Sequence, residues 1–164
     1  MSESQPARFA DPGADLLSFL DEYAVVCPSC QRCARASVID SNRPPLFAPR
    51  RMTCTNCGHM DEWQGNGVSS SFSEEPRDWY FQRPFYFRVA CCGHELWVLN
   101  RRHLQFLKDF VGAKLRSRSR SERGWSNRSL ASRLPTWISA GTHRDKILVA
   151  LTRIEEIMDA EETR

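Results

Sequence analysis

Cys27-Pro-Ser-Cys30 and Cys54-Thr-Asn-Cys57 decide the fold of this chain, because they form two Cys-x-x-Cys pairs separated by 23 residues. Each pair can make a tight turn in which both thiolates point the same way. Two such turns on neighbouring hairpins supply four sulfurs for one tetrahedral ion. Four thiolates fill every position around the ion and leave none open for a substrate. The spacing predicts one closed, structural Zn²⁺ site with the ligands Cys27, Cys30, Cys54 and Cys57.

Two alternatives concern the first pair. A lone Cys-x-x-Cys motif at the start of a helix is typical of thioredoxin-like redox proteins, but here a second, matched pair follows. Cys33 also lies three residues after Cys30 and competes with Cys27 as its partner. We favour Cys27, because Pro28 fixes φ inside that turn, as Gly58 supplies a permissive backbone after the second pair.

The rest of the sequence predicts an α+β fold: an N-terminal zinc ribbon with an appended antiparallel β-hairpin and two main α-helices. Strands are expected over residues 23–26, 36–40, 51–53 and 60–63, and the hairpin over 79–90 and 95–99. So small a ribbon should fold only together with its metal. The expected segments are a flexible N-terminus with a short helix (1–22), the ribbon (23–65), a Gly/Ser-rich linker (66–78), and the hairpin plus helical region (79–164).

Helix signals flank these strands. Residues 1–10 are expected to be disordered, and Asp11-Pro12 resembles a cap for a short helix over 14–22. Asn100 is expected to cap a helix over 101–116, and Thr142-His-Arg-Asp145 to form a capping box for a final helix. That helix carries one apolar stripe: Ile147, Leu151, Ile154 and Met158. The stripe predicts packing against the 101–116 helix, whereas an exposed stripe would indicate a homodimer rather than a monomer.

Net charge and cysteine content indicate which classes of partner and which cellular compartment to expect. The 164-residue chain has a formal charge of +3, and a four-thiolate zinc site would lower it to about +1, so global charge predicts no polyanion partner. The sequence shows neither a signal peptide nor a membrane-spanning run. Seven cysteines, an odd number, in paired spacing favour metal binding over disulfides. We therefore expect a cytoplasmic protein without a membrane partner.

A low-complexity basic run extends from Arg116 to Arg128. An aromatic side chain among arginines can stack on a base while the guanidinium groups contact phosphates, which favours nucleic acid as a partner. The alternative is a solvated linker between two helices. The candidate nucleic-acid-binding residues are Arg116, Arg118, Arg120, Arg123, Trp125 and Arg128.

Cys91-Cys92-Gly93-His94 forms a second, ambiguous motif. Cys92-Gly93 is expected to be the tight turn of the hairpin. Adjacent side chains on a strand point in divergent directions, so we do not expect both thiols to bind one ion. One of them could still join His94 with Cys33 or His59 in a second metal site, or the two could act as a redox sensor.

No catalytic arrangement emerges. His94-Glu95 would need a histidine at position 98 to make a zinc-protease helix, and Val98 stands there. The zinc deaminase pattern requires His-x-Glu before Pro-Cys-x-x-Cys, whereas here His and Glu are adjacent and the order is inverted. The sequence therefore predicts a protein that is not an enzyme.

The two cysteine pairs resemble zinc ribbons of the transcription factor IIB type. Two further stretches are similar to small bacterial zinc-ribbon proteins of unassigned function: Arg88-Val-Ala-Cys-Cys-Gly-His-Glu-Leu-Trp-Val-Leu-Asn-Arg-Arg-His-Leu104 and Ser129-Leu-Ala-Ser-Arg-Leu-Pro-Thr-Trp-Ile138. These resemblances cover most of residues 23–158 and imply a zinc-dependent architecture without naming an activity. Together with the basic run, they lead us to expect a zinc-ribbon binding protein associated with nucleic acid. The alternative is a protein adaptor that uses the aromatic hairpin or the last helix.

Overall fold

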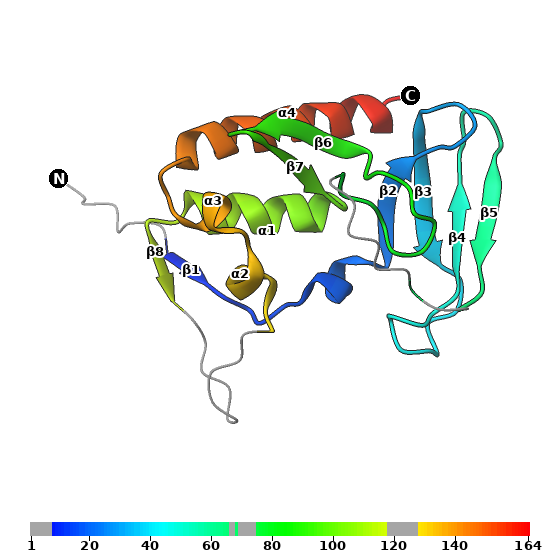
Figure 1. Ribbon diagram of the computed structural model, residues 1–164, viewed down its shortest axis with the longest axis horizontal. Helices are drawn as coiled ribbons and strands as arrows, with labels where there is room; N and C mark the ends of the chain where they lie inside the picture. Colours follow the sequence, from blue (N-terminus) through cyan, green and yellow to red (C-terminus); the bar gives the residue numbers. More distant parts are fainter. Residues whose placement is uncertain (1–7, 66–67, 69–74, 118–127) are drawn as a thin grey trace.

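The computed structural model of the chain describes residues 8–65, 68, 75–117 and 128–164. A four-stranded sheet stands at one end of the molecule (Figure 1). Two long helices and a β-hairpin fill the middle, and a short two-stranded pair lies at the opposite end. This arrangement confirms the expected α+β class.

The four-stranded sheet consists of β2 (Glu22–Val26), β3 (Cys33–Val38), β4 (Arg50–Thr53) and β5 (Met60–Trp63). Its strands are antiparallel in the order β2-β3-β4-β5, which confirms the two predicted hairpins. The return strand begins at Cys33, not at Ala36 as predicted, because it pairs with Val26 as soon as the cysteine turn closes. We call residues 22–63 the cysteine sheet.

The predicted hairpin and helices form the other half of the molecule. Strand β6 (Phe87–Cys91) lies beside α4 (Arg144–Glu162), and its partner β7 (His94–Val98) contacts α1 (Arg101–Gly112). Helix α4 also packs against α1. We call these four elements the helical half. The predicted apolar stripe of α4 is buried in it, so it is not an exposed dimer surface. Strand β6 is shorter than expected, because residues 79–80 form a turn instead.

The N-terminal region departs from expectation. Residues 8–10, expected to be disordered, form β1 (Arg8–Ala10), which pairs in parallel with β8 (Leu115–Ser117). Phe9 packs edge-on against Phe106 and Phe110 of α1, at 5.4 Å between ring centroids in both cases. Instead of a helix over 14–22, the chain makes one 3₁₀ turn, η1 (Leu16–Phe19). Helix α1 ends at Gly112, short of the predicted 116, since the chain extends at Ala113 to reach β8.

One predicted helix cap is right and two are wrong. The side chain of Asn100 accepts from the backbone N–H of His103 at 3.0 Å, as predicted for the start of α1. Ser129 caps α2 (Leu130–Arg133), and α3 (Thr136–Ser139) follows without having been predicted. The capping box at 142–145 is wrong, because His143 precedes α4 and its side chain makes no capping bond. Asp11 does not cap η1 either, and Asp15 takes that role.

The two halves share backbone hydrogen bonds. The N–H of Ala24 on β2 donates to Leu99 O at 3.2 Å, and the N–H of Val26 donates to Pro84 O at 2.9 Å. The edge of the cysteine sheet is thereby bonded to the chain on both sides of the hairpin. Pro84 takes part in this pairing through its carbonyl oxygen, since proline has no N–H to donate.

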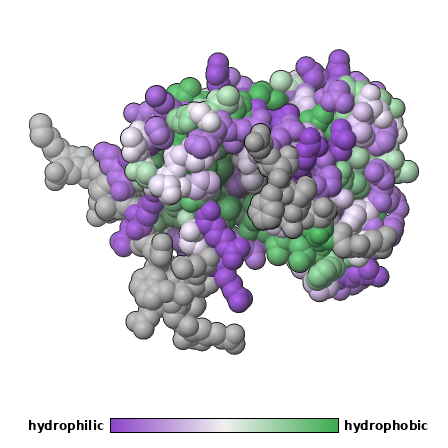
Figure 2. Space-filling view, viewed as in Figure 1, coloured by the Kyte–Doolittle hydropathy of each residue, from purple (hydrophilic) through white to green (hydrophobic). Residues whose placement is uncertain are grey.

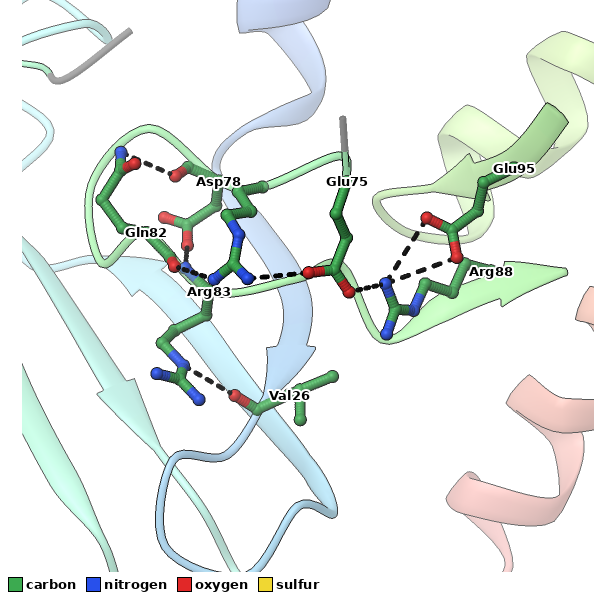
Figure 3. A network of polar contacts seen from close by, with 8 residues as sticks. Val26, Glu75, Asp78, Gln82, Arg83, Arg88 and Glu95 are labelled. Carbon is green, nitrogen blue, oxygen red and sulfur yellow. Dashed lines mark hydrogen bonds and ion pairs between the residues drawn. The ribbon is translucent and has the colours of Figure 1, made fainter. Parts of the chain in front are cut away.

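A buried carboxylate organises the chain that enters β6. Asp78 accepts from the backbone N–H groups of Tyr80 and Phe81 at 2.9 Å and of Arg83 at 2.8 Å. Figure 3 shows this turn together with Glu75, which lies between it and Arg88 of β6. A buried carboxylate that accepts several backbone N–H groups is stable inside a protein, so Asp78 fixes the turn that places the hairpin beside the cysteine sheet.

Hydrophilic and hydrophobic residues are interspersed over the face of the molecule in Figure 2. Among the residues that the structure describes, no helix is both long and apolar enough to cross a membrane.

Candidate metal centre

The two cysteine turns have the same backbone hydrogen bonds. In the first, Cys27 N–H donates to Arg32 O at 2.8 Å, and Gln31 N–H donates to Cys27 O at 3.0 Å. In the second, Cys54 N–H donates to His59 O at 2.8 Å, and the N–H of residue 58 donates to Cys54 O at 2.9 Å. The turns are thus two copies of one structure, each closing a hairpin of the cysteine sheet.

The residue after the second cysteine of each turn has a left-handed backbone. Gly58 has φ +75°, and the equivalent residue of the first turn, Gln31, has φ +62°. Glycine adopts this conformation freely, whereas a residue with a side chain pays for it in strain. The predicted role of Gly58 is confirmed. The matching role of Gln31 was missed, although its position directly after Cys30 was a usable signal.

The four predicted ligands come together. Their sulfur atoms all lie within 4.8 Å of one another, with Cys27 Sγ 3.6 Å from Cys57 Sγ and Cys30 Sγ 3.5 Å from Cys54 Sγ. Four sulfurs at ~2.3 Å from a tetrahedral ion would be about 3.8 Å apart. The cluster therefore fits a zinc ion with little movement. The ion would occupy a site closed by four protein ligands.

Local hydrogen bonds prepare the cluster for a cation. The backbone N–H of Arg32 is the largest influence that lowers the pKa of the Cys30 thiol, to about 6. For Cys57, the backbone bond to His59 lowers the pKa, but desolvation and the other cluster sulfurs outweigh it and raise the value to about 12. One thiolate is thus favoured in the metal-free cluster, and full ionisation needs a positive ion, because neighbouring thiolates repel one another.

Cys33 is not a member of the cluster. Burial is the main cause that raises the pKa of its thiol to about 12, so it stays protonated at neutral pH. It starts β3 opposite Val26 and packs against the hydrophobic core. The structure therefore brings Cys27, and not Cys33, together with Cys30 and the second pair.

A side-chain contact joins the two turns outside the cluster. Ser29 Oγ lies 3.0 Å from His59 Nδ1, so a hydrogen bond connects the first turn to the second. From the sequence, His59 was a candidate only for a second metal site with Cys91 or Cys92. In the structure this histidine instead helps to hold the two cysteine turns in register.

Three arginines of the cysteine sheet contact groups other than the cluster sulfurs. Arg35 pairs with Glu22 at 2.8 Å, and Arg51 pairs with Glu62 at 2.7 Å. Arg50 is fully buried, donates to Leu20 O and lies 4.1 Å from the ring centroid of Tyr80. Sequence reasoning missed this buried guanidinium, because its partners Leu20 and Tyr80 each lie 30 residues away in the sequence.

Four of the six candidate nucleic-acid residues, Arg118, Arg120, Arg123 and Trp125, lie outside the described residues. Arg116 donates to the backbone oxygens of Phe110 and Ser139, and its guanidinium lies 4.1 Å from the Phe110 ring centroid. It therefore anchors the start of the basic run to α1. Arg128 is exposed beside α2.

The second cysteine motif forms the predicted turn, but the described residues give it no three-ligand site. Within the described ranges, only the Cys27, Cys30, Cys54 and Cys57 cluster brings three or more His, Cys, Asp or Glu together closely enough for an ion. The His94 ring is stacked on Trp137 at 4.7 Å between centroids. The expectation that the thiols of Cys91 and Cys92 diverge is wrong, because their sulfurs lie 3.4 Å apart.

Comparisons of the chain with models of known protein families, with curated proteins and with solved structures found no match. The resemblance to bacterial zinc-ribbon proteins stays a prediction from sequence.

Proposed function

We propose that the protein is a non-enzymatic binding module whose cysteine sheet is held by one structural Zn²⁺. The observation that carries this proposal is the cluster of four sulfurs within 4.8 Å, presented by two turns of the same backbone structure. Thiolate ligands in tetrahedral arrangement suit zinc, and four protein ligands leave no position for water or substrate. The ion would stabilise the fold and take no part in a reaction.

Metal analysis tests this proposal. The purified protein is expected to contain one zinc per chain, and Cys54→Ser is expected to lose it. Cys33→Ser is the matched control, because Cys33 is a nearby thiol outside the cluster, and it should retain the metal. Zinc retained by Cys54→Ser, or a wild-type protein that holds no zinc after loading, would overturn the assignment.

Zinc affinity should also depend on pH. Binding requires four thiolates and so releases protons from those thiols that are still protonated, including Cys57 with its raised pKa of about 12. The affinity should therefore weaken on acidification, by about tenfold per pH unit for each proton released. Competition with a zinc-binding dye at pH 6, 7 and 8 measures this slope, and an affinity independent of pH would exclude thiolate ligation.

For the partner we propose nucleic acid, contacted through the basic run and its neighbours over residues 116–133. Since Arg116 is engaged with α1, the phosphate contacts would fall to the later arginines of the run. Trp125 would stack on a base. Phosphate contacts release counterions, so the affinity should fall steeply with salt, by a slope of about 0.7 per contact for single strands.

A charge-matched pair of variants tests the partner. Replacement of Arg118, Arg120 and Arg123 by glutamine should weaken oligonucleotide binding and reduce the salt slope by about 2. The control replaces Arg35, Arg51 and Arg102, which are ion-paired on the surface, and should leave the slope unchanged. An equal effect of both triple variants, or no binding at low salt, would reject nucleic acid and favour the adaptor interpretation.

A further inference from the structure

The turn between β6 and β7 has an unusual residue. Cys91 and His94 are the last paired residues of the hairpin, and Cys92-Gly93 form its two-residue loop. Both loop residues have positive φ, +55° for Cys92 and +79° for Gly93. This is a type I′ turn, whose first position is normally Asn, Asp or Gly because other side chains are strained there. Cysteine at this position is a local outlier, and such outliers concentrate at functional sites.

The left-handed backbone brings two thiols side by side. In an extended strand, consecutive side chains point to opposite faces. Here the reversal at Cys92 places its Sγ 3.4 Å from that of Cys91, and both thiols are free. Two sulfurs on one central atom, with bonds on the order of 2.3 Å as in zinc thiolates, can be at most about 4.6 Å apart. The pair can therefore bind one atom without a rearrangement of the hairpin.

The thiols are reached from a shallow depression between the hairpin and α4. Its volume is about 380 Å³, and its α4 residues are Asp145, Lys146, Val149, Ala150 and Arg153. Cys92 is half-buried and Cys91 is 7% exposed, so the depression is the approach to both sulfurs. Burial, and then the neighbouring Cys92 sulfur, raise the pKa of Cys91 to about 11, whereas Lys146 lowers it. The first thiol is therefore protonated at neutral pH.

In the part of the chain that the structure describes, no third ligand completes an ordinary metal site here. Among the described residues, the two thiols have no third His, Cys, Asp or Glu at metal-binding distance. Zinc requires four ligands, so it is a poor match for this pair. A central atom that needs only two protein sulfurs, and whose remaining valence is filled by its own substituent, fits the geometry.

We propose that Cys91 and Cys92 form a dithiol site for trivalent, thiophilic metalloid compounds, of which an organic arsenical is the simplest. In the hydrated arsenical, R–As(OH)₂, two arsenic–oxygen bonds break and two arsenic–sulfur bonds form. The two thiol protons leave with the two hydroxides as two molecules of water. No atom changes oxidation state, so no oxidant or reductant is needed.

Phenylarsine oxide at one equivalent, added to the full-length protein loaded with zinc, tests the site. Intact mass and thiol titration should show one adduct per chain and the loss of two free thiols, with the zinc retained. Cys92→Asn removes one sulfur while placing a preferred residue in the type I′ turn, so this variant should fold and bind at least tenfold more weakly. Cys91→Ser should behave in the same way.

Cys33→Ser is the matched control, since it also removes one partly buried thiol outside the cysteine cluster. It should form the same adduct as the wild type. An adduct on Cys92→Asn equal to that on the wild type would overturn the proposal, as would adduct formation matched by zinc release. The inference does not depend on the zinc assignment. Whether or not the cysteine cluster holds zinc, the wild type should bind one arsenical per chain more than Cys92→Asn does.

Discussion

The cysteine sheet and the helical half obtain their stability from different sources. The central strands of the sheet bury the small side chains of Ala34 and Ala36, with Met52 as their largest apolar residue. The larger buried side chains of the sheet, Tyr23 and Val25, lie on β2, the strand whose backbone bonds Leu99 and Pro84. The helical half buries Leu, Ile and Phe from two helices and a hairpin: Leu96, Val98, Leu104, Leu107, Phe110, Ile147, Leu151, Ile154 and Met158. Each buried methylene contributes about 0.8 kcal/mol, so alanines contribute far less than leucines.

This difference assigns separate roles to metal and packing. Ordering a residue costs roughly 1–2 kcal/mol of conformational entropy in either half. The helical half can offset that cost by apolar burial. Beyond β2 the cysteine sheet has little burial of large apolar side chains, and it has instead the four-sulfur cluster and the buried Arg50. Metal-directed changes should therefore act on one half and core truncations on the other.

The largest expected effect is that of removing the metal. In Cys54→Ser the cysteine sheet should lose a contribution on the order of 10 kcal/mol, the scale of structural zinc in small domains. Hydrogen exchange should then accelerate most in β4 and β5, which lie farthest from the helical half in the sheet order. Strand β2 should keep partial protection, because its backbone also bonds Leu99 and Pro84. Unchanged protection of β4 and β5 would mean that the sheet does not depend on metal.

The next effect concerns the core of α4. Leu151 is 0% exposed, and Leu151→Ala should lower the free energy of unfolding by about 2–5 kcal/mol through lost burial and a cavity. Val149→Ala on the same helix is the control, since Val149 is 62% exposed and should change stability by less than about 0.5 kcal/mol. Urea unfolding followed by circular dichroism measures both. A similar loss for the two variants would contradict the separation of roles, as would zinc release by Leu151→Ala.

Acid should act on the helical half through His103. Burial lowers the pKa of this imidazole from 6.5 to about 4. The unfolded chain then binds a proton at His103 more tightly than the folded chain does. The contribution of the neutral His103 to the free energy of unfolding is therefore complete above about pH 6.5 and is lost as the pH falls toward 4. The full loss is about 3 kcal/mol.

His103→Gln, which cannot titrate, isolates this contribution. The difference in unfolding free energy between wild type and His103→Gln should change by that amount between pH 6.5 and 4, because metal loss affects both proteins alike. A constant difference across this range would show that His103 is not held neutral by the fold.

The smallest effect compares the two cysteine turns. Gly58 has φ +75° and its added Cβ would meet no atom within 4 Å, so Gly58→Ala should cost only the backbone strain, about 1 kcal/mol. Gln31→Gly relieves the same strain in the first turn, but it also raises the conformational entropy of the unfolded chain. The two effects oppose each other, so the free energy of unfolding should change by no more than about 0.5 kcal/mol. Thermal unfolding of the zinc-loaded proteins measures both. Gly58→Ala adds a side chain at a positive φ and Gln31→Gly removes one, so equal destabilisation by the two variants would contradict the equivalence of the two turns.

Local patterns in the sequence predicted the parts of the fold that depend on local chemistry. The cysteine spacing predicted the cluster, since the second and third residues of a Cys-x-x-Cys turn have little choice of conformation. Likewise, Cys92-Gly93 predicted the hairpin turn, and the three-and-four spacing of Ile147, Leu151, Ile154 and Met158 predicted the buried face of α4.

The missed features depend on residues distant in sequence. Nothing near Arg8 indicates that it will pair with Leu115, and nothing near Arg50 indicates that it will meet Tyr80. The side-by-side thiols of Cys91 and Cys92 were missed for another reason: strand alternation was applied to a residue whose φ is +55°. A cysteine directly before glycine in a two-residue loop was the available signal.

The pairing of β1 with β8 attaches residues 8–10 to residues 115–117, more than a hundred positions later in the chain. Leu115 is paired to Arg8 before residues 118–127 begin, and after them Ser129 Oγ donates to Asp11 at 2.6 Å. Both ends of the arginine-rich segment are thereby tied to the same few N-terminal residues. Trimming the protein back to residue 12 would release both ties at once, so a shortened version could keep its cysteine cluster intact and still present its basic segment in the wrong place.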